Sequence, residues 1–128
     1  MSVVDASAYV DYLTSTQLSE LIAPRLAGGI DVPAIFTSEV MSGLRGMVAG
    51  RRLQVHDADR AIDRVRQVER FEHSFSPFMA RAWELRENLS VYDAWYVALA
   101  ESLDTELLTT DRRLARASGP RCPVVLVA

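Results

Sequence analysis

Four acidic residues are the side chains of this sequence whose types and positions suggest chemistry: Asp5, Glu39, Asp93 and Asp111. Carboxylates brought together repel one another strongly unless a divalent cation lies between them. Hard oxygen ligands with room for water suit Mg²⁺, and Mn²⁺ is able to substitute for it. Such an ion lowers the pKa of a bound water and neutralises charge on a phosphate, which is the chemistry of phosphodiester hydrolysis.

The elements that must position these acids follow from the spacing of apolar residues. Short apolar runs predict strands at residues 2–5, 31–35, 70–73, 106–111 and 124–127. Amphipathic patterns predict helices at residues 6–13, 18–26, 36–50, 57–70, 77–89, 90–101 and 112–117. This alternation predicts an α/β protein, a three-layer α/β/α sandwich around a central, mainly parallel sheet of about four to five strands. The length fits a single domain spanning residues 1–128.

This arrangement predicts that the acids converge. In an open parallel sheet, functional groups gather at the carboxyl ends of the strands. Asp5 and Asp111 follow predicted strands, whereas Glu39 and Asp93 lie in the first turns of predicted helices. Because a helix that follows a parallel strand starts at the same edge of the sheet, we expect all four carboxylates to meet there. Asp93 shares its helix face with apolar Val97, so its carboxylate must be neutralised, hydrogen-bonded or bound to a cation.

Each acid alone also has a structural explanation. Asp5 and Asp111 are suited to cap the helices that follow them. Ser90-x-x-Asp93 is similar to a capping box. Glu39 is favoured in a first helical turn by the helix dipole. The hypothesis of a metal site therefore depends on the four acids together.

The composition excludes several classes of function. All 14 basic residues are arginine, so a Schiff base, a Walker A loop and a phosphorylated receiver domain, which all need lysine, are excluded. The formal net charge of -3 argues against a wholly basic surface but leaves room for local patches. The single cysteine, Cys122, forms no internal disulfide, and with two histidines zinc is disfavoured. Without an apolar span or a secretory signal, we expect a cytoplasmic protein with no membrane contact.

Four segments around the acids form a more specific pattern. They are residues 3–7, 38–40, 89–101 and 107–114, and they include Tyr-Asp-Ala-x-Tyr-x-Ala-Leu-Ala followed by Thr-x-Asp. In order and spacing, over almost the whole chain, this pattern resembles the PIN-domain ribonuclease toxins of the VapC type. The resemblance implies a PIN-like fold and a Mg²⁺-dependent endoribonuclease toxin of a type II toxin–antitoxin module. Such an enzyme cuts structured cellular RNA, either tRNA or rRNA, and inhibits translation and growth.

The resemblance also implies roles for individual residues and for partners. The family's four acidic positions correspond to the four acids named above, and its small hydroxyl positions correspond to Ser7 and Thr109. These hydroxyls are expected to order the acids or a metal-bound water. An acid or amide that some members carry shortly after the last acid is absent, since Ala115 and Arg116 stand there. A homodimer and a cognate VapB-type antitoxin, which inserts a segment over the acids in a hetero-oligomer, are implied as well.

Other residues have two interpretations. Arg112, Arg113 and Arg116 flank Asp111 and are candidates for binding RNA phosphates, or they form an exposed helix face. A second arginine patch is formed by residues 45, 51 and 52, and a stripe of glycines by residues 43, 46 and 50. The glycine stripe admits another backbone closely or serves ordinary helix packing. The tryptophans Trp83 and Trp95 and the methionines are expected in the core, and His56 and His73 alone on the surface.

Two further functions remain open from the sequence. One is a non-catalytic PIN-like module that keeps the fold for protein binding, which metal titration distinguishes from an enzyme. The other is a DNA or flap nuclease of the same broad fold, which a comparison of RNA and DNA cleavage distinguishes.

Overall fold

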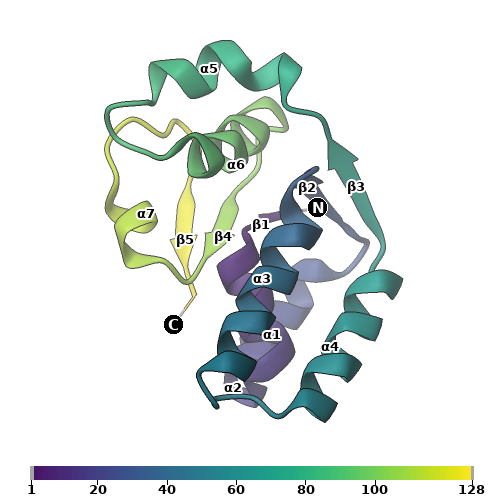
Figure 1. Cartoon of the computed structure of the whole chain (residues 1–128). Helices are drawn as coiled ribbons and strands as arrows, with labels where there is room; N and C mark the ends of the chain where they lie inside the picture. Colours follow the sequence, from purple (N-terminus) through teal and green to yellow (C-terminus); the bar gives the residue numbers. More distant parts are fainter. Residues whose placement is uncertain (1, 128) are drawn as a thin grey trace.

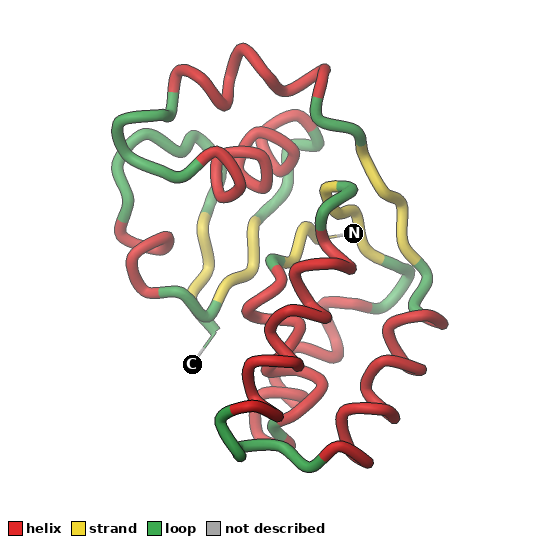
Figure 2. Tube along the Cα trace, in the orientation of Figure 1, coloured by secondary structure: helices red, strands yellow, loops and turns green. Residues whose placement is uncertain are grey.

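The computed structural model describes residues 2–127, so residues 1 and 128 of the expected domain lie outside the described part. The five strands are β1 (Ser2–Val4), β2 (Ile30–Pro33), β3 (Arg70–His73), β4 (Leu107–Thr109) and β5 (Val124–Leu126). The helices are α1 (Ala6–Thr14), α2 (Thr16–Ile22), α3 (Phe36–Ala49), α4 (Val55–Gln67), α5 (Met79–Glu84), α6 (Val91–Ser102) and α7 (Arg112–Arg116). Two 3₁₀ turns, η1 (Ala23–Leu26) and η2 (Ser76–Phe78), precede β2 and α5 (Figures 1 and 2).

All five strands form one parallel sheet in the order β3-β2-β1-β4-β5. The chain first builds outward from β1 to β2 and β3, and then returns to the other side of β1 to add β4 and β5. Because crossovers between parallel strands are right-handed, this reversal places α1–α4 on one face of the sheet and α5–α7 on the other. The predicted three-layer sandwich with a parallel sheet is confirmed.

The two helical layers are visible as separate groups. In Figure 1, α1–α4 lie in the lower part of the view, and α5 and α6 lie in the upper part. Helix α6 packs against β1, β2 and β4 and is covered in turn by α5. All seven residues from Ala94 to Ala100 are buried, as expected for a helix that is apolar nearly all round. Among residues 2–127, no helix is long and apolar enough to span a membrane.

Helix α5 is shorter than the sequence pattern predicts. The pattern predicts a helix over residues 77–89, but the chain forms η2 and then only the six residues of α5. A helix this short cannot bury every side, so the expectation that Trp83 and Met79 lie in the core is wrong. The side chains are 65% and 55% exposed, and the Arg86 guanidinium lies 4.7 Å from the centre of the Trp83 ring. Met41 on α3 is likewise 54% exposed, whereas Trp95 is buried as expected.

The expectation that His73 stands alone on the surface is also wrong. Its Nε2 lies 2.8 Å from Oδ1 of Asp31, a residue that is only 6% exposed within β2. Parallel pairing sets Asp31 beside Phe71 and Pro33 beside His73, so these alternate residues share one face of β2 and β3. The histidine therefore supplies a hydrogen-bonding partner to a buried acid, a pairing that only the strand register determines.

The glycine stripe on α3 has a packing role at one position. A Cβ atom on Gly43 would lie 3.0 Å from Cγ2 of Val10, so the missing side chain lets α1 and α3 approach closely. At Gly46, by contrast, a Cβ atom would meet nothing within 4 Å. The close contact at Gly43 sets the separation of the two helices that begin beside the acids.

Candidate active site

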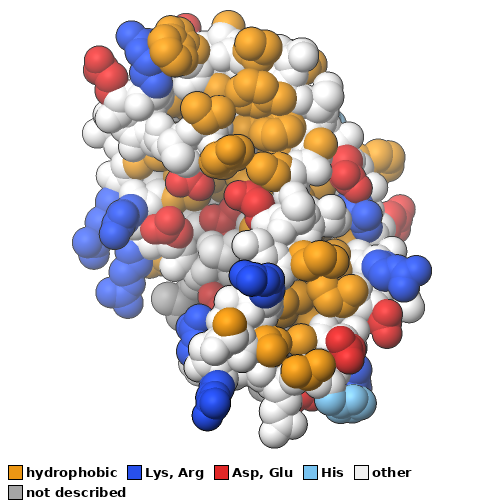
Figure 3. Space-filling view, in the orientation of Figure 1, with side chains coloured by type: hydrophobic (Ala, Val, Ile, Leu, Met, Phe, Trp, Pro, Cys, Tyr) orange, Lys and Arg blue, Asp and Glu red, His pale blue; other side chains and the backbone are white. Residues whose placement is uncertain are grey.

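The four acids lie at the carboxyl edge of the sheet. Asp5 directly follows β1 and Asp111 closely follows β4, the neighbouring strand, while Glu39 and Asp93 occupy the first turns of α3 and α6. The chain reverses its direction of growth at β1 and β4, which is where parallel sheets form their ligand crevice. Figure 3 shows acidic side chains together in a hollowed band, below a broad apolar surface and beside arginines.

Asp5 is buried, and both of its carboxylate oxygens are held. It caps α1, and its Oδ1 accepts hydrogen bonds from the Ser7 hydroxyl (2.7 Å) and the Ala8 backbone N–H (2.8 Å). Its Oδ2 accepts from the hydroxyl of Thr109, which is completely buried. Burial raises the pKa of Asp5 to about 6, even though these three hydrogen bonds act to lower the pKa. Both predicted hydroxyl residues therefore contact this acid directly.

Thr109 also connects Asp5 to Asp111. The backbone N–H of Asp111 donates to Oγ1 of Thr109 (2.9 Å), the same hydroxyl that donates to Asp5. The Asp111 side chain caps α7 by accepting from the backbone N–H of Arg113 (2.8 Å) and Leu114 (3.4 Å). Asp111 therefore caps α7 and is also connected to Asp5 through Thr109.

Asp93 stands electrostatically at the centre of the group. Its backbone N–H donates to the Ser90 hydroxyl (3.1 Å), which begins α6. Burial and then the negative charge of Asp111 raise its pKa, against a lowering by the hydrogen bond with Ser90. The charge of Asp93 in turn raises the pKa of both Asp5 and Glu39. The charge of Asp93 therefore repels the charge of each of the other three acids.

Glu39 is held by a residue to which the sequence analysis assigns no role. The Tyr96 hydroxyl donates to Oε1 of Glu39 over 2.8 Å and joins α6 to α3. Burial raises the pKa of Glu39, the Tyr96 hydrogen bond lowers it, and the charge of Asp93 raises it. The signal available in the sequence was the position of Tyr96 three residues after Asp93, which places both on the same side of α6.

The donors present suit a hard divalent cation. Among residues 2–127, none of the four acids forms an ion pair with arginine or histidine, so their mutual repulsion is not offset by the chain itself. No three His, Cys, Asp or Glu side chains in this range are close enough to hold one ion between them. Mg²⁺ typically takes only one or two protein carboxylates and keeps several waters, so neighbouring carboxylates rather than a closed cage are the arrangement it requires.

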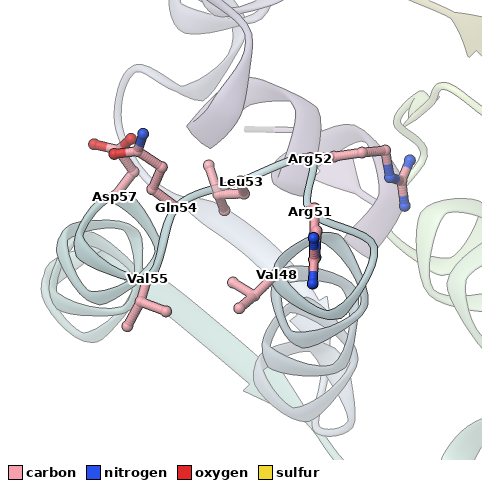
Figure 4. A pocket seen from close by; sticks show the side chains of 7 residues that line it. All are labelled: Val48, Arg51, Arg52, Leu53, Gln54, Val55 and Asp57. Carbon is pink, nitrogen blue, oxygen red and sulfur yellow. The ribbon is translucent and has the colours of Figure 1, made fainter.

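A groove lies between α1 and α3, and Glu39 is the one member of the acid group among the residues that line it. Its volume is about 380 Å³, and Ser7, Glu39, Gly43 and Arg52 are among the residues that line it. A larger hollow of about 670 Å³ lies at the turn between α3 and α4, and no residue of the acid group lines it. In Figure 4, the Arg52 side chain extends away from the other side chains around that hollow. The group of acids therefore borders the smaller groove, through Glu39, and not the larger hollow.

Arginines without ion-pair partners surround the acids. Arg112, Arg113 and Arg116 project from α7, directly after Asp111, and Arg52 lies at the end of the groove. None of these four side chains forms an ion pair or a hydrogen bond within residues 2–127. Figure 3 shows positively charged side chains along the side of the acidic band that lies over α7. The chain has a net negative charge, yet unpaired arginine side chains lie beside its acids.

Comparison with known proteins agrees with this fold. The profile of the PIN domain family matches residues 2–120. The protein PAE2754 from Pyrobaculum aerophilum, whose crystal structure is known, shares the fold with a TM-score of 0.67 at 24% identity, over 89% of this chain and 76% of that chain.

Curated relatives match at higher identity. Ribonuclease VapC9 of Mycobacterium tuberculosis is 41% identical over 128 residues, which cover 99% of this chain and 98% of the relative. Ribonuclease VapC3 of the same species is 44% identical over 90% of this chain and 85% of the relative, and Ribonuclease VapC12 is 35% identical over the full length of both. The chain therefore belongs to the PIN domain family and, within it, to the VapC ribonucleases.

Proposed function

We propose that the protein is a Mg²⁺-dependent endoribonuclease toxin of a type II toxin–antitoxin module, acting on structured tRNA or rRNA. The observation that carries the proposal is a group of four carboxylates at the crevice of a PIN-domain sheet, in which Asp93 repels the other three and none is paired with a cation from residues 2–127. Membership of the VapC ribonucleases supports the choice of RNA as substrate.

Each acid has a distinct part in the proposal. Asp5, Asp93 and Asp111 hold Mg²⁺ directly or through water, and Glu39 binds it or positions the attacking water. Mn²⁺ substitutes for Mg²⁺. The bound ion supplies an activated water and neutralises charge on the scissile phosphate. Ser7 and Thr109 keep Asp5 in one orientation, since together with the Ala8 backbone they occupy both of its oxygens.

The arginines of α7 are proposed to hold the RNA. Arg112, Arg113 and Arg116 follow Asp111 immediately, so a phosphate bound by them lies within reach of the acids. Arginine contacts to phosphate position a nucleic acid without reading its sequence, and structured RNA is recognised largely through its shape. These residues thus place the backbone, while the surface around the groove selects the RNA.

Protein partners are proposed on the basis of exposed apolar surface. Met41 and Val55 are more than half exposed beside an apolar groove between α3 and α4. Met79 and Trp83 on α5 and Tyr92 on α6 are also more than half exposed. Figure 3 shows a broad apolar surface in the region of these two helices. Contiguous apolar surface of this kind marks protein interfaces. These surfaces support the proposal that the protein forms a homodimer and binds a VapB-type antitoxin. Because the proposed substrate is cellular RNA, we propose that the reaction takes place in the cytoplasm.

The decisive experiment compares Asp93→Asn with Asp63→Asn. Asp63 lies on α4 with a side chain that is 67% exposed, so its variant is a matched control for the loss of one carboxylate. With total RNA and Mg²⁺, we expect Asp93→Asn to lose at least about a hundred-fold in cleavage rate, because the ion supplies several kcal/mol of transition-state stabilisation. The control should cleave as wild type does, and growth arrest should follow cleavage.

Two results would contradict the proposal. Full cleavage by both Asp5→Asn and Asp93→Asn excludes a metal site formed by these acids. Cleavage of single-stranded DNA at the rate of RNA indicates a DNA nuclease of the same fold. Mapping of the cut sites on total RNA then separates tRNA from rRNA as the substrate.

A further inference from the structure

The four acids differ in what holds them in place. Asp5 accepts three hydrogen bonds, Asp111 accepts two from the backbone at the start of α7, and Asp93 is hydrogen-bonded with Ser90. Each of these arrangements is local to a helix start or to a neighbouring strand. Glu39 has no such local support, since within residues 2–127 its side chain makes no hydrogen bond with the start of α3.

Tyr96 is the residue that holds Glu39. Within residues 2–127, the hydrogen bond from the Tyr96 hydroxyl to Oε1, over 2.8 Å, is the only one that the Glu39 side chain makes. Glutamate has three rotatable side-chain bonds, and fixing such a side chain costs up to about 2 kcal/mol of conformational entropy. Without the tyrosine, Glu39 would lose this conformational entropy each time that a cation binds.

The tyrosine is suited to this task because it is buried within a helix of the core. Its side chain is only 2% exposed and lies in the buried stretch of α6. Its hydroxyl points to Glu39 and donates to Oε1 over 2.8 Å. The same helix carries Asp93, so one rigid element sets the positions of two of the acids.

We infer that Tyr96 is a positioning residue: its hydroxyl binds one oxygen of Glu39 and thereby directs the other oxygen toward a bound divalent cation. This inference rests on the proposed function, because it concerns how the proposed metal site is prepared. Residues that orient a metal-binding carboxylate typically change metal affinity by about ten-fold to a hundred-fold when they are removed.

The test measures Mn²⁺ binding by titration calorimetry on the full chain without RNA. Tyr96→Phe removes the hydroxyl and keeps the ring, so we expect the affinity for Mn²⁺ to fall about ten-fold. Tyr9→Phe is the matched control, since Tyr9 is equally buried, packs its ring against Phe36 and donates to none of the four acids within residues 2–127. Its affinity should equal that of wild type.

A double-substitution cycle separates positioning from general effects on packing. In the Glu39→Gln background, adding Tyr96→Phe should cause no further loss of Mn²⁺ affinity, because the carboxylate that Tyr96 orients is already gone. An equal loss in both backgrounds, or a Tyr96→Phe protein that binds Mn²⁺ as wild type does, overturns the inference.

Failure of the proposed function gives a different pattern. If wild type and Asp93→Asn both fail to bind Mn²⁺, the metal site itself is wrong and the inference falls with it. If wild type binds, Asp93→Asn does not, and Tyr96→Phe matches wild type, only the role of Tyr96 is wrong. Should Tyr96→Phe not fold, a crystal structure of wild type with Mn²⁺ decides. Glu39 bound to both Tyr96 and the ion supports the inference, and Glu39 released from Tyr96 overturns it.

Discussion

The carboxylate of Asp5 stabilises the fold as a helix cap and costs stability as a buried charge. As the cap of α1 it satisfies the Ala8 backbone N–H, which favours the folded state. As a carboxylate that is only 5% exposed, it loses hydration when it ionises, and burial raises its pKa to about 6. The protein therefore holds a charge that it stabilises poorly by itself, as is common where a bound ion completes a site.

This raised pKa predicts how the stability of the metal-free protein depends on pH. The folded-state pKa of Asp5 lies above the unfolded value of 3.8, so the folded state binds the proton more tightly. The resulting stabilisation is complete below pH 4 and is lost as the pH rises through about 6. Between pH 4.5 and 7.5 we expect Asp5 to contribute a loss of about 2 kcal/mol in the free energy of unfolding.

Urea denaturation at several pH values, in the presence of a chelator, measures this loss. Asp5→Asn should flatten the decline by about that amount, because asparagine does not titrate, whereas the exposed Asp63→Asn should leave the decline unchanged. If Asp5→Asn declines as steeply as wild type over this pH range, Asp5 is better compensated than its burial indicates. Saturating Mn²⁺ should reduce the decline, since the ion favours the ionised form.

The acids were accessible to sequence analysis because each one occupies a position that local rules define. Asp5 and Asp111 follow strands, Asp93 follows a serine at helix-capping distance, and the sheet edge is shared by all parallel strands. Tyr96 was not accessible in the same way, since its contact with Glu39 spans 57 positions of sequence and depends on how α6 lies against α3. The spacing of three residues from Asp93 places Tyr96 on the same side of α6, but it does not identify Glu39 as the partner.

At the scale of elements, the starting points of α1, α3 and α6 decide where the acids lie. Predictions of helix existence were accurate where the apolar spacing was long, as in α3 and α6, and inaccurate for α5, where few residues face the core. Helix α1 and helix α3 approach closely at Gly43, and this contact fixes the distance between the turns that carry Asp5 and Glu39.

Two glycines of α3 should therefore respond in opposite directions to a larger residue. At Gly46 a Cβ atom meets nothing within 4 Å, so Gly46→Ala should stabilise the protein by about 0.5–1 kcal/mol through helix propensity alone. At Gly43, Gly43→Val places a branched side chain against Val10, already 3.0 Å from the new Cβ, and should destabilise by about 1–3 kcal/mol. Thermal and urea unfolding measure both.

The same pair tests whether helix separation matters for the site. Because Gly43→Val pushes α3 away from α1, Mn²⁺ affinity should fall with stability, whereas Gly46→Ala should leave affinity unchanged. If both variants are equally stable, α3 is able to move against α1 without loss of stability. The contact at Gly43 would then not explain the position of Glu39.

For the whole molecule, charge placement matters more than net charge. The chain has a formal net charge of -3, yet unpaired arginines lie beside the acids on α7 and at the end of the groove. Other arginines are bound within the fold, such as Arg81, whose Nε and Nη2 donate to Glu101 and join α5 to α6. Only the structure separates these two groups, because composition counts all 14 arginines equally.

The free arginines should give RNA binding a measurable dependence on salt. Each phosphate contact releases counterions, so removing one contact lowers the slope of log affinity against log salt by about 0.7 for single strands and 0.9 for duplex. In an Asp93→Asn background that does not cleave, replacing Arg112 and Arg113 together by alanine should weaken binding and lower the slope by about two contacts. Replacement of Arg60 and Arg66 together by alanine is the matched control, since both are exposed arginines on α4, and it should leave the slope unchanged. If the control changes the slope as much as the α7 pair does, the RNA binds across the whole surface, and α7 has no special part in placing a phosphate beside Asp111.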